Sequence, residues 1–203
     1  MSRYRSPRLR VVRRLGKLPG LTRKISIKTN PPGQHGSSFN KKTSLYNVRL
    51  KEKQKLRYHY CVSERQLLNY VKKSRKKKGS SGKLLLTFLE MRLDNLVFRL
   101  GFAPTIMAAK QLVNHGHVLV NNSSINIPSF GCQPKDTISV KNSILSKNLV
   151  KRNLDLSGNI LVPQHLFLNR DILEAKVLSL VNRKSISLVI NELLVIEYYS
   201  RKL

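Results

Sequence analysis

Positive charge is distributed very unevenly along this chain. The first 83 of its 203 residues carry 25 lysines and arginines but only two acids, Glu52 and Glu64, whereas residues 84–203 carry 14 basic residues against 8 acidic ones. The formal charge of the whole chain is +29, and a field of this strength favours a polyanionic partner, of which nucleic acid is the most abundant. An anionic membrane surface is the alternative. It favours a basic helix with bulky apolar residues on one face, and residues 1–44 show no such pattern.

Several other classes of protein are excluded by the sequence. With 40% hydrophobic residues the chain can bury a core, so wholesale disorder is not expected. No apolar run approaches the roughly eighteen residues of a membrane span, since Leu188–Ile196 is interrupted by Asn191 and Glu192, and the N-terminus lacks the apolar region of a secretory signal. Cys61 and Cys132 are too far apart in sequence for a paired-cysteine motif, so we expect no disulfide framework, metal site or cofactor.

Residues 1–44 form the first segment, a basic arm. They are rich in Arg, Lys, Gly, Pro and Ser and show no sustained apolar period. Such a segment cannot bury enough apolar surface to fold alone. We expect an extended, turn-rich arm that becomes ordered on a partner.

Residues 45–89 have the pattern of a helical body. Helical signals begin near Leu45, and Ser63-Glu64-Arg65-Gln66 has the sequence of a capping box that opens a helix through Lys73. The run Arg75–Lys78, followed by Gly79–Gly82, is predicted to follow a phosphate backbone; the alternative is a solvated charge run.

A second folded unit is predicted from residue 83 onward. Leucines at positions 85, 89, 93, 96 and 100 predict one helix that ends at Gly101, with Arg92, Asn95 and Arg99 on its opposite face. A second helix begins after Pro104, is capped by Thr105 and ends at Gly116. Residues 117–120 and 125–127 predict two strands joined by a turn at residues 121–124, where the two asparagines tolerate the left-handed conformation, and residues 136–140 predict a third strand.

The predicted fold class is therefore α+β: an extended basic N-terminal arm, a helical body, and two short helices packed on a small antiparallel sheet. We divide the chain into an arm at 1–44, a helical body at 45–89, a domain at 90–152 and a variable region at 153–186. The segment 187–203 should pack back against the helical body as a helix or strand, while residues 142–162 are polar with isolated apolar residues and predict no element.

Specific motifs point to a known family. Met91–Asn95, Arg99–Gly101, Ala109–Val113 and His115–Asn121 closely resemble the S-four (S4) RNA-binding domain. Further motifs resemble the small-subunit ribosomal protein S4 family and reach both ends of the chain: Arg3–Arg5 with Pro7–Leu9, Pro32–Gly36, Arg49–Arg57, Ser63–Gln66, Ile190–Glu192 and Glu197–Ser200.

This resemblance implies a structural protein that binds small-subunit rRNA first and nucleates assembly of the subunit body. It also implies contact with ribosomal protein S-five, at an interface linked to decoding accuracy, and with mRNA near its entry path through Lys41 and Lys42. Residues 1–60 contain no cysteine, so the zinc site of some family members is not expected. The sequence variant is similar to chloroplast members; a bacterial cytoplasmic or mitochondrial source is the alternative. No homo-oligomer is expected.

Structured RNA is bound mainly through phosphates and 2′-hydroxyls, which calls for rigidly held cations with Thr, Asn and Gln beside them. The first turn of the second helix, Thr105–Met107, could add backbone N–H donors. We expect Arg99→Glu to weaken rRNA binding without unfolding the chain. The candidate rRNA-binding residues are Arg3, Arg5, Arg8, Arg10, Arg13, Arg14, Lys51, Lys55, Arg57, Arg65, Lys76, Lys77, Arg92, Asn95, Arg99, Thr105, Lys110, Gln111, His115 and His117.

Two other functions are compatible with parts of the sequence. In pseudouridine synthases, which also carry S4 domains, a catalytic Asp follows an Arg-Leu pair as in Arg92-Leu93-Asp94, but no separate catalytic domain remains here. Asp94 is therefore interpreted as a carboxylate that orients an arginine. A free-standing RNA-binding factor is the non-enzymatic alternative, and it would not need both the long arm and the C-terminal motif. Tyr58, Tyr60 and Tyr70 could stack on bases, although their spacing favours packing.

Overall fold

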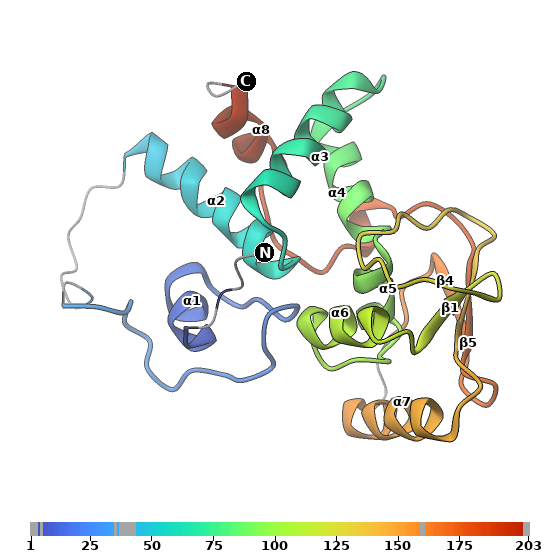
Figure 1. Ribbon diagram of the computed structural model, residues 1–203. Coiled ribbons are helices and arrows are strands. Elements are labelled where there is room, and N and C mark those ends of the chain that lie inside the picture. Colours follow the sequence, from blue (N-terminus) through green and yellow to red (C-terminus); the bar gives the residue numbers. More distant parts are fainter. Residues whose placement is uncertain (1–3, 5, 35, 37–43, 159–160, 201–203) are drawn as a thin grey trace.

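The computed structural model describes residues 4, 6–34, 36, 44–158 and 161–200. A mostly helical part lies beside a part that contains the sheet (Figure 1). The arm lies beside the first part, and its middle reaches the second part, where Ile106 N donates to the carbonyl of Gly20 (Figure 1). An α+β fold is confirmed.

The arm contains a helix where an extended segment was expected. Helix α1 (Arg8–Leu15) buries Val11, and the following turn buries Leu18 and Leu21. These three side chains belong to the same core as the helical body. The expectation of a wholly extended arm is therefore wrong for this segment, because packing against the body stabilises a helix too short to form alone.

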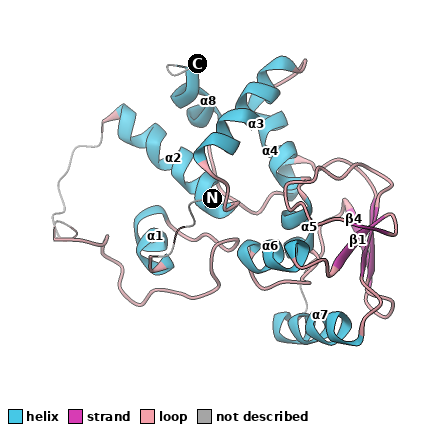
Figure 2. Cartoon of the chain, viewed as in Figure 1, coloured by secondary structure: helices cyan, strands magenta, loops and turns pink. Residues whose placement is uncertain are grey.

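The helical body consists of α2 (Leu45–His59), α3 (Glu64–Lys76), α4 (Ser81–Glu90) and the C-terminal α8 (Glu192–Ser200), which packs against α2 and α4 (Figure 2). The capping box is confirmed: the Ser63 side chain accepts from Gln66 N, and the Gln66 side chain accepts from Ser63 N. Leu56, Leu67 and Val195 are fully buried. The C-terminal segment thus returns to the body as a helix, one of the two predicted forms.

The helix predicted across residues 83–100 is interrupted. Helix α4 ends at Glu90 and α5 (Leu93–Arg99) begins three residues later. Leu93 N donates to Phe130 O at 2.9 Å, and Cys132 N donates to Met91 O at 2.9 Å. Hydrogen bonds to a distant loop therefore replace helical ones at the break. The spacing of the leucines could not reveal this break, because the leucines before it and after it are all buried in the core.

The second part is built on α5, α6 (Ile106–Asn114) and a five-stranded antiparallel sheet of order β2-β1-β3-β5-β4. Its strands are β1 (Val118–Val120), β2 (Ser123–Ser124), β3 (Thr137–Val140), β4 (Leu166–Asn169) and β5 (Glu174–Val177). The left-handed conformation expected of the asparagines is confirmed, since Asn121 and Asn122 adopt φ of 50° and 64°. The second strand, however, forms at Ser123–Ser124, inside the predicted turn, and residues 125–127 form no strand. Gly116 ends α6 at φ 71°, a conformation that favours glycine.

Two features of residues 142–186 differ from the sequence-based expectation. Helix α7 (Ile144–Ser157) forms where no element was expected, and its Ile144 and Leu145 are each 79% exposed, so its sequence lacks a clear apolar face. Strands β4 and β5, with a short 3-10 turn (Arg183–Ser185), lie in the region set apart as variable. Because β5 pairs with β3, this region completes the sheet and does not form a separate unit.

Candidate nucleic-acid interface

The arginines of α1 divide into two groups. Arg10 and Arg14 are exposed to solvent. Arg8 donates to the carbonyl of Leu21 at 3.3 Å, and Arg13 donates from Nε to a carbonyl of the same arm at 2.9 Å. Arg8 and Arg13 therefore help to fold the arm, and Arg10 and Arg14 are placed to meet a phosphate.

The basic residues of α2 are partly buried. Lys55 pairs with Glu52 at 2.5 Å, and the Arg57 guanidinium lies over the Tyr58 ring at 4.8 Å from its centroid. Lys51 is half-buried on the same helix. These contacts hold the Lys55 and Arg57 side chains in place, and both side chains remain partly exposed.

The densest group of exposed cations lies at the junction of α3 and α4. We call it the hairpin tip, and it consists of Lys72, Lys73, Arg75, Lys76, Lys77 and Lys78, all of which are exposed. Lys73 and Lys77 lie over the Phe88 ring at 5.1 and 5.2 Å, which orients both ammonium groups. Arg65 is exposed on the same helix. Lys72 and Lys73 were missed as candidates, although their position one helical turn before Lys76 and Lys77 indicates a shared face.

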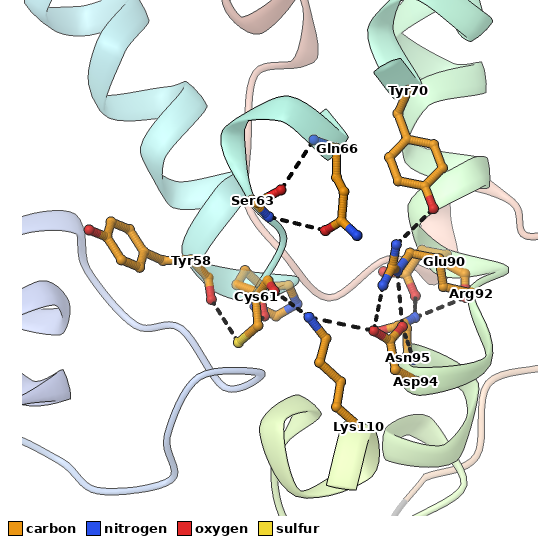
Figure 3. Close-up of polar contacts among 11 residues, drawn as sticks. Tyr58, Cys61, Ser63, Gln66, Tyr70, Glu90, Arg92, Asp94, Asn95 and Lys110 are labelled. Carbon is orange, nitrogen blue, oxygen red and sulfur yellow. Dashed lines mark hydrogen bonds and ion pairs between the residues drawn. The ribbon is translucent and has the colours of Figure 1, made fainter. Parts of the chain in front are cut away.

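Arg92 belongs to a buried network. It donates from Nε and Nη2 to both carboxylate oxygens of Asp94, at 3.0 and 2.7 Å, and from Nη1 to the Tyr70 hydroxyl at 2.7 Å (Figure 3). Arg92 is 2% exposed and Asp94 is 0% exposed. Burial alone would lower the pKa of Arg92, but the facing Asp94 carboxylate outweighs it and raises that pKa. The interpretation of Asp94 as an arginine-orienting carboxylate is confirmed.

Glu90 is the centre of a second buried network. Its carboxylate accepts from Arg99 Nη2 at 2.8 Å, from Asn95 Nδ2 at 2.6 Å and from the Tyr60 hydroxyl at 2.5 Å. Arg99 also donates to Ser187 Oγ at 2.7 Å. Burial would raise the pKa of Glu90, but the Arg99 guanidinium and these hydrogen bonds outweigh it, so the pKa lies below its ordinary value. The carboxylate is therefore held ionised.

The expected exposed face of Arg92, Asn95 and Arg99 is consequently wrong. Arg92 and Asn95 are buried, and the Arg99 side chain is 11% exposed. Two buried carboxylates need these partners, because an unpaired buried charge is strongly unfavourable. Of the three tyrosines that could have stacked on bases, Tyr60 is 1% exposed and packs in the core.

Lys110 joins the two parts of the molecule. Its ammonium donates to the carbonyl of Cys61 and lies 3.7 Å from Asp94 Oδ2 (Figure 3). Burial lowers the pKa of Lys110, and the Asp94 carboxylate opposes this effect. Lys110 is thus mainly a connection between α6 and the turn that follows α2, with only part of its side chain at the surface.

The first turn of α6 is occupied by the arm. Thr105 caps the helix as predicted, accepting from Ala108 N at 3.3 Å. Ile106 N donates to the carbonyl of Gly20 at 2.9 Å. The expected set of open N–H donors is therefore not available at Ile106, because the arm already satisfies it.

The histidines of this region lie near the end of α6. Gln111 and His115 are exposed, while His117 is half-buried with Nδ1 2.9 Å from Ser146 Oγ. No group of three His, Cys, Asp or Glu that could hold a metal occurs among the described residues.

Burial raises the pKa of the Cys132 thiol to about 12, as suits a core cysteine.

Four candidates lie outside the described residues. They are Arg3 and Arg5 at the N-terminus, and Lys41 and Lys42 before α2.

Comparison with known proteins decides the family. A family model described as "Ribosomal protein S4/S9 N-terminal domain" matches residues 3–90, and one described as "S4 domain" matches residues 91–138. The chain is 66% identical to small ribosomal subunit protein uS4c of Euglena gracilis, 57% to uS4 of Thermosynechococcus vestitus and 53% to uS4c of Nephroselmis olivacea. Each alignment covers 100% of both chains. The chain belongs to the ribosomal protein S4 family.

Membership of the S4 family decides between the alternatives left open by the sequence. The S4 family is structural, so the chain is not an enzyme, and the burial of Asp94 agrees with this. The chloroplast type expected from the sequence is confirmed by the relatives named uS4c. Within the described chain, no helix combines the length and apolar character needed to cross a bilayer.

Proposed function

We propose that this S4-family chain is a structural component of the small subunit of chloroplast ribosomes and binds rRNA through three surfaces, two basic and one polar. The first is the arm face with Arg10 and Arg14, the second is the hairpin tip, and the third is the α6 face with Gln111 and His115. The observation that carries the proposal is the hairpin tip, where six cations are all exposed. Exposed cations of this density remain available for phosphates.

Binding of rRNA before other proteins, and nucleation of the subunit body, form the finer part of this proposal. The chain folds its own arm onto its body through Val11, Leu18 and Leu21, so much of the arm is ordered before any RNA arrives. Preorganisation of this kind lowers the entropic cost of binding protein-free RNA. The test is titration of purified, protein-free small-subunit rRNA with the full chain. Specific saturation supports primary binding, and a requirement for other ribosomal proteins contradicts it.

Sedimentation provides a second test of the same proposal. We expect nearly all of the chain in a native extract to sediment with the small subunit and to remain there after a high-salt wash. A mostly free pool, or one removed by modest salt, would instead favour a free-standing RNA-binding factor.

A surface for S-five is proposed where α2 meets the segment before α8. There Val189 is 90% exposed and Leu193 is 63% exposed, and Glu52 and Lys55 line the same shallow groove. Apolar side chains at this level of exposure, rimmed by charge, are typical of a protein interface. Val189→Asp with Leu193→Asp should weaken binding of purified S-five and alter decoding accuracy while leaving rRNA affinity unchanged. Unchanged S-five binding would remove this surface from the proposal.

Contact with mRNA is proposed for Lys41 and Lys42. They follow a Ser37–Asn40 stretch that has polar residues and no basic ones, so these two lysines carry the charge of that segment. Lys41→Gln with Lys42→Gln should slow translation through a stable mRNA hairpin without affecting unstructured mRNA. Equal rates on both messages would contradict the assignment.

A further inference from the structure

One face of the sheet remains open to solvent. Along β3 and β5 the side chains alternate, with Ile138, Val140, Ala175 and Val177 buried in the core. The residues between them point to the opposite face, as the two-residue period of a strand requires. In Figure 2 the helices lie to one side of the strands and below them, and loops border the remaining side.

A row of three side chains crosses this open face. In the strand register Phe167 of β4 is opposite Lys176 of β5, and Lys176 is opposite Thr137 of β3. Directly opposed residues on one sheet face lie within contact distance. Thr137 is held in turn by Asn121, whose Oδ1 accepts from Thr137 N at 2.9 Å. Hence an aromatic ring, a cation and hydrogen-bonding groups follow one another across the sheet.

The aromatic member of the row is unusually exposed. Phe167 is 58% exposed, against 52% for Tyr46 and 38% for Tyr4, the other exposed aromatic side chains of the described chain. A phenylalanine has no polar atom to hydrate, so this exposure is unfavourable unless a partner covers the ring.

The charge around Phe167 favours an anionic partner. Lys176 is exposed and forms no ion pair with any described residue. Lys135 is held beside the end of β5, where its N donates to Val177 O at 2.7 Å. The only acid on the face, among described strand residues, is Glu174, which lies in the next row opposite Asn169 and Ser139.

We propose that Phe167 and Lys176 form a binding site for one unpaired RNA nucleotide. The base would stack on the Phe167 ring, and the adjoining phosphate would meet the Lys176 ammonium. Aromatic side chains on an open antiparallel sheet, with cations beside them, are suited to unpaired bases, which present a π-face that a duplex hides. A protein partner is less favoured because the neighbours of the ring in the row are a lysine and a threonine, so the apolar surface is not continuous. This site goes beyond the three surfaces proposed above.

The chain offers a direct probe because it contains no tryptophan. Phe167→Trp therefore places the only tryptophan of the chain in the site, and its emission can be excited selectively at wavelengths that tyrosine does not absorb. A matched control is Leu193→Trp, since Leu193 is 63% exposed on α8, away from the sheet (Figure 1). Each full-length variant is titrated with a short, unstructured oligouridylate carrying a terminal dye, whose anisotropy reports binding by the chain as a whole.

Saturating oligouridylate should quench the emission of the Phe167→Trp variant strongly and that of the Leu193→Trp variant weakly, although both bind. Inorganic polyphosphate should not reproduce the quenching, because it has charge but no bases. Equal quenching in both variants, quenching by polyphosphate, or no quenching at position 167 while anisotropy reports binding would each overturn the site. In these cases the rRNA-binding proposal itself would still stand, since titration of protein-free rRNA with the chain tests it separately.

The cation is tested in the same background. Lys176→Gln added to Phe167→Trp should shift the quenching midpoint about threefold to tenfold to higher RNA concentration, as expected when one phosphate is no longer neutralised. Lys147→Gln on α7 is the matched control and should leave the midpoint unchanged. An unchanged midpoint with Lys176→Gln overturns the role of the lysine. In the assembled small subunit, a photo-crosslinker at position 167 should attach to rRNA, and attachment to a protein would overturn the choice of partner.

Discussion

Arg99 Nη2 lies 2.8 Å from Glu90 Oε1, and this pair spans the break between α4 and α5. The Glu90 side chain is 1% exposed and that of Arg99 is 11% exposed. An arginine that the sequence placed on an RNA-binding face is therefore a structural partner for a buried carboxylate.

Replacement of Arg99 should destabilise the fold. Arg99→Glu or Arg99→Ala leaves Glu90 buried without its counter-ion, and removal of one partner of a buried pair typically costs about 3–5 kcal/mol. This reverses the sequence-based expectation of a folded variant with weakened RNA binding. Chemical denaturation measures the effect, with exposed Arg65→Ala as the control. A midpoint for Arg99→Ala equal to that of the control would contradict the structural role.

A methyl group at position 20 should disturb the packing of the arm between α2 and α6. A Cβ built on Gly20 would lie 2.4 Å from His59 O and 2.6 Å from Ile106 Cδ1. Gly20→Ala should therefore lower the free energy of unfolding by about 1–3 kcal/mol and make the arm more sensitive to protease. Gly131→Ala is the control, because a Cβ there meets nothing within 4 Å. Identical protease sensitivity of the two variants would rule out close packing at Gly20.

Stability should decrease in mild acid because of His59. Burial lowers the pKa of His59 from 6.5 to about 4, with the nearby Glu90 carboxylate opposing the effect and Arg99 adding to it. The unfolded chain then binds a proton that the folded chain does not, so stability falls as the pH drops from about 6.5 to about 4 and levels off below that. His165, whose pKa burial also lowers, acts in the same direction.

The shift corresponds to a loss of up to about 3 kcal/mol from His59. His59→Phe should reduce the slope of unfolding free energy against pH, measured by urea denaturation between pH 4 and 7. A His59→Phe variant with the full slope would show that other groups govern the acid response.

The hairpin tip should set part of the salt dependence of rRNA binding. Lys76→Gln, Lys77→Gln and Lys78→Gln combined should weaken affinity and reduce the slope of log affinity against log salt by about one for each phosphate that is no longer neutralised. Lys141→Gln with Lys147→Gln, outside the three proposed surfaces, is the control. A slope equal to that of the parent chain would exclude the tip from the interface.

Local signals in the sequence predicted much of the fold. The capping box at Ser63, the Thr105 cap and the left-handed conformation of Asn121 and Asn122 depend on neighbouring residues alone and occur as expected. The break between α4 and α5 depends on hydrogen bonds to the 128–132 loop, which no local pattern reveals. Helix α7 was missed because Ile144 and Leu145 are exposed, so its apolar residues do not share one face.

The candidate site was predictable in charge but not in exposure. The hairpin tip was visible as a run of basic residues, and its cations are exposed. Arg92 and Arg99 are basic as well, yet each pairs with a buried carboxylate close to it in sequence. Only the packed structure distinguishes a cation that neutralises an internal charge from one left for a phosphate.

The hydrogen bond from Ile106 N to Gly20 O has a mechanical consequence. Gly20 packs between the end of α2 and the start of α6, so the arm bridges the two parts of the molecule. A hinge motion that separated those parts would first have to break the hydrogen bond and displace Gly20. This contact therefore opposes relative motion of the two parts, and a pull on the arm would act on both of them at once.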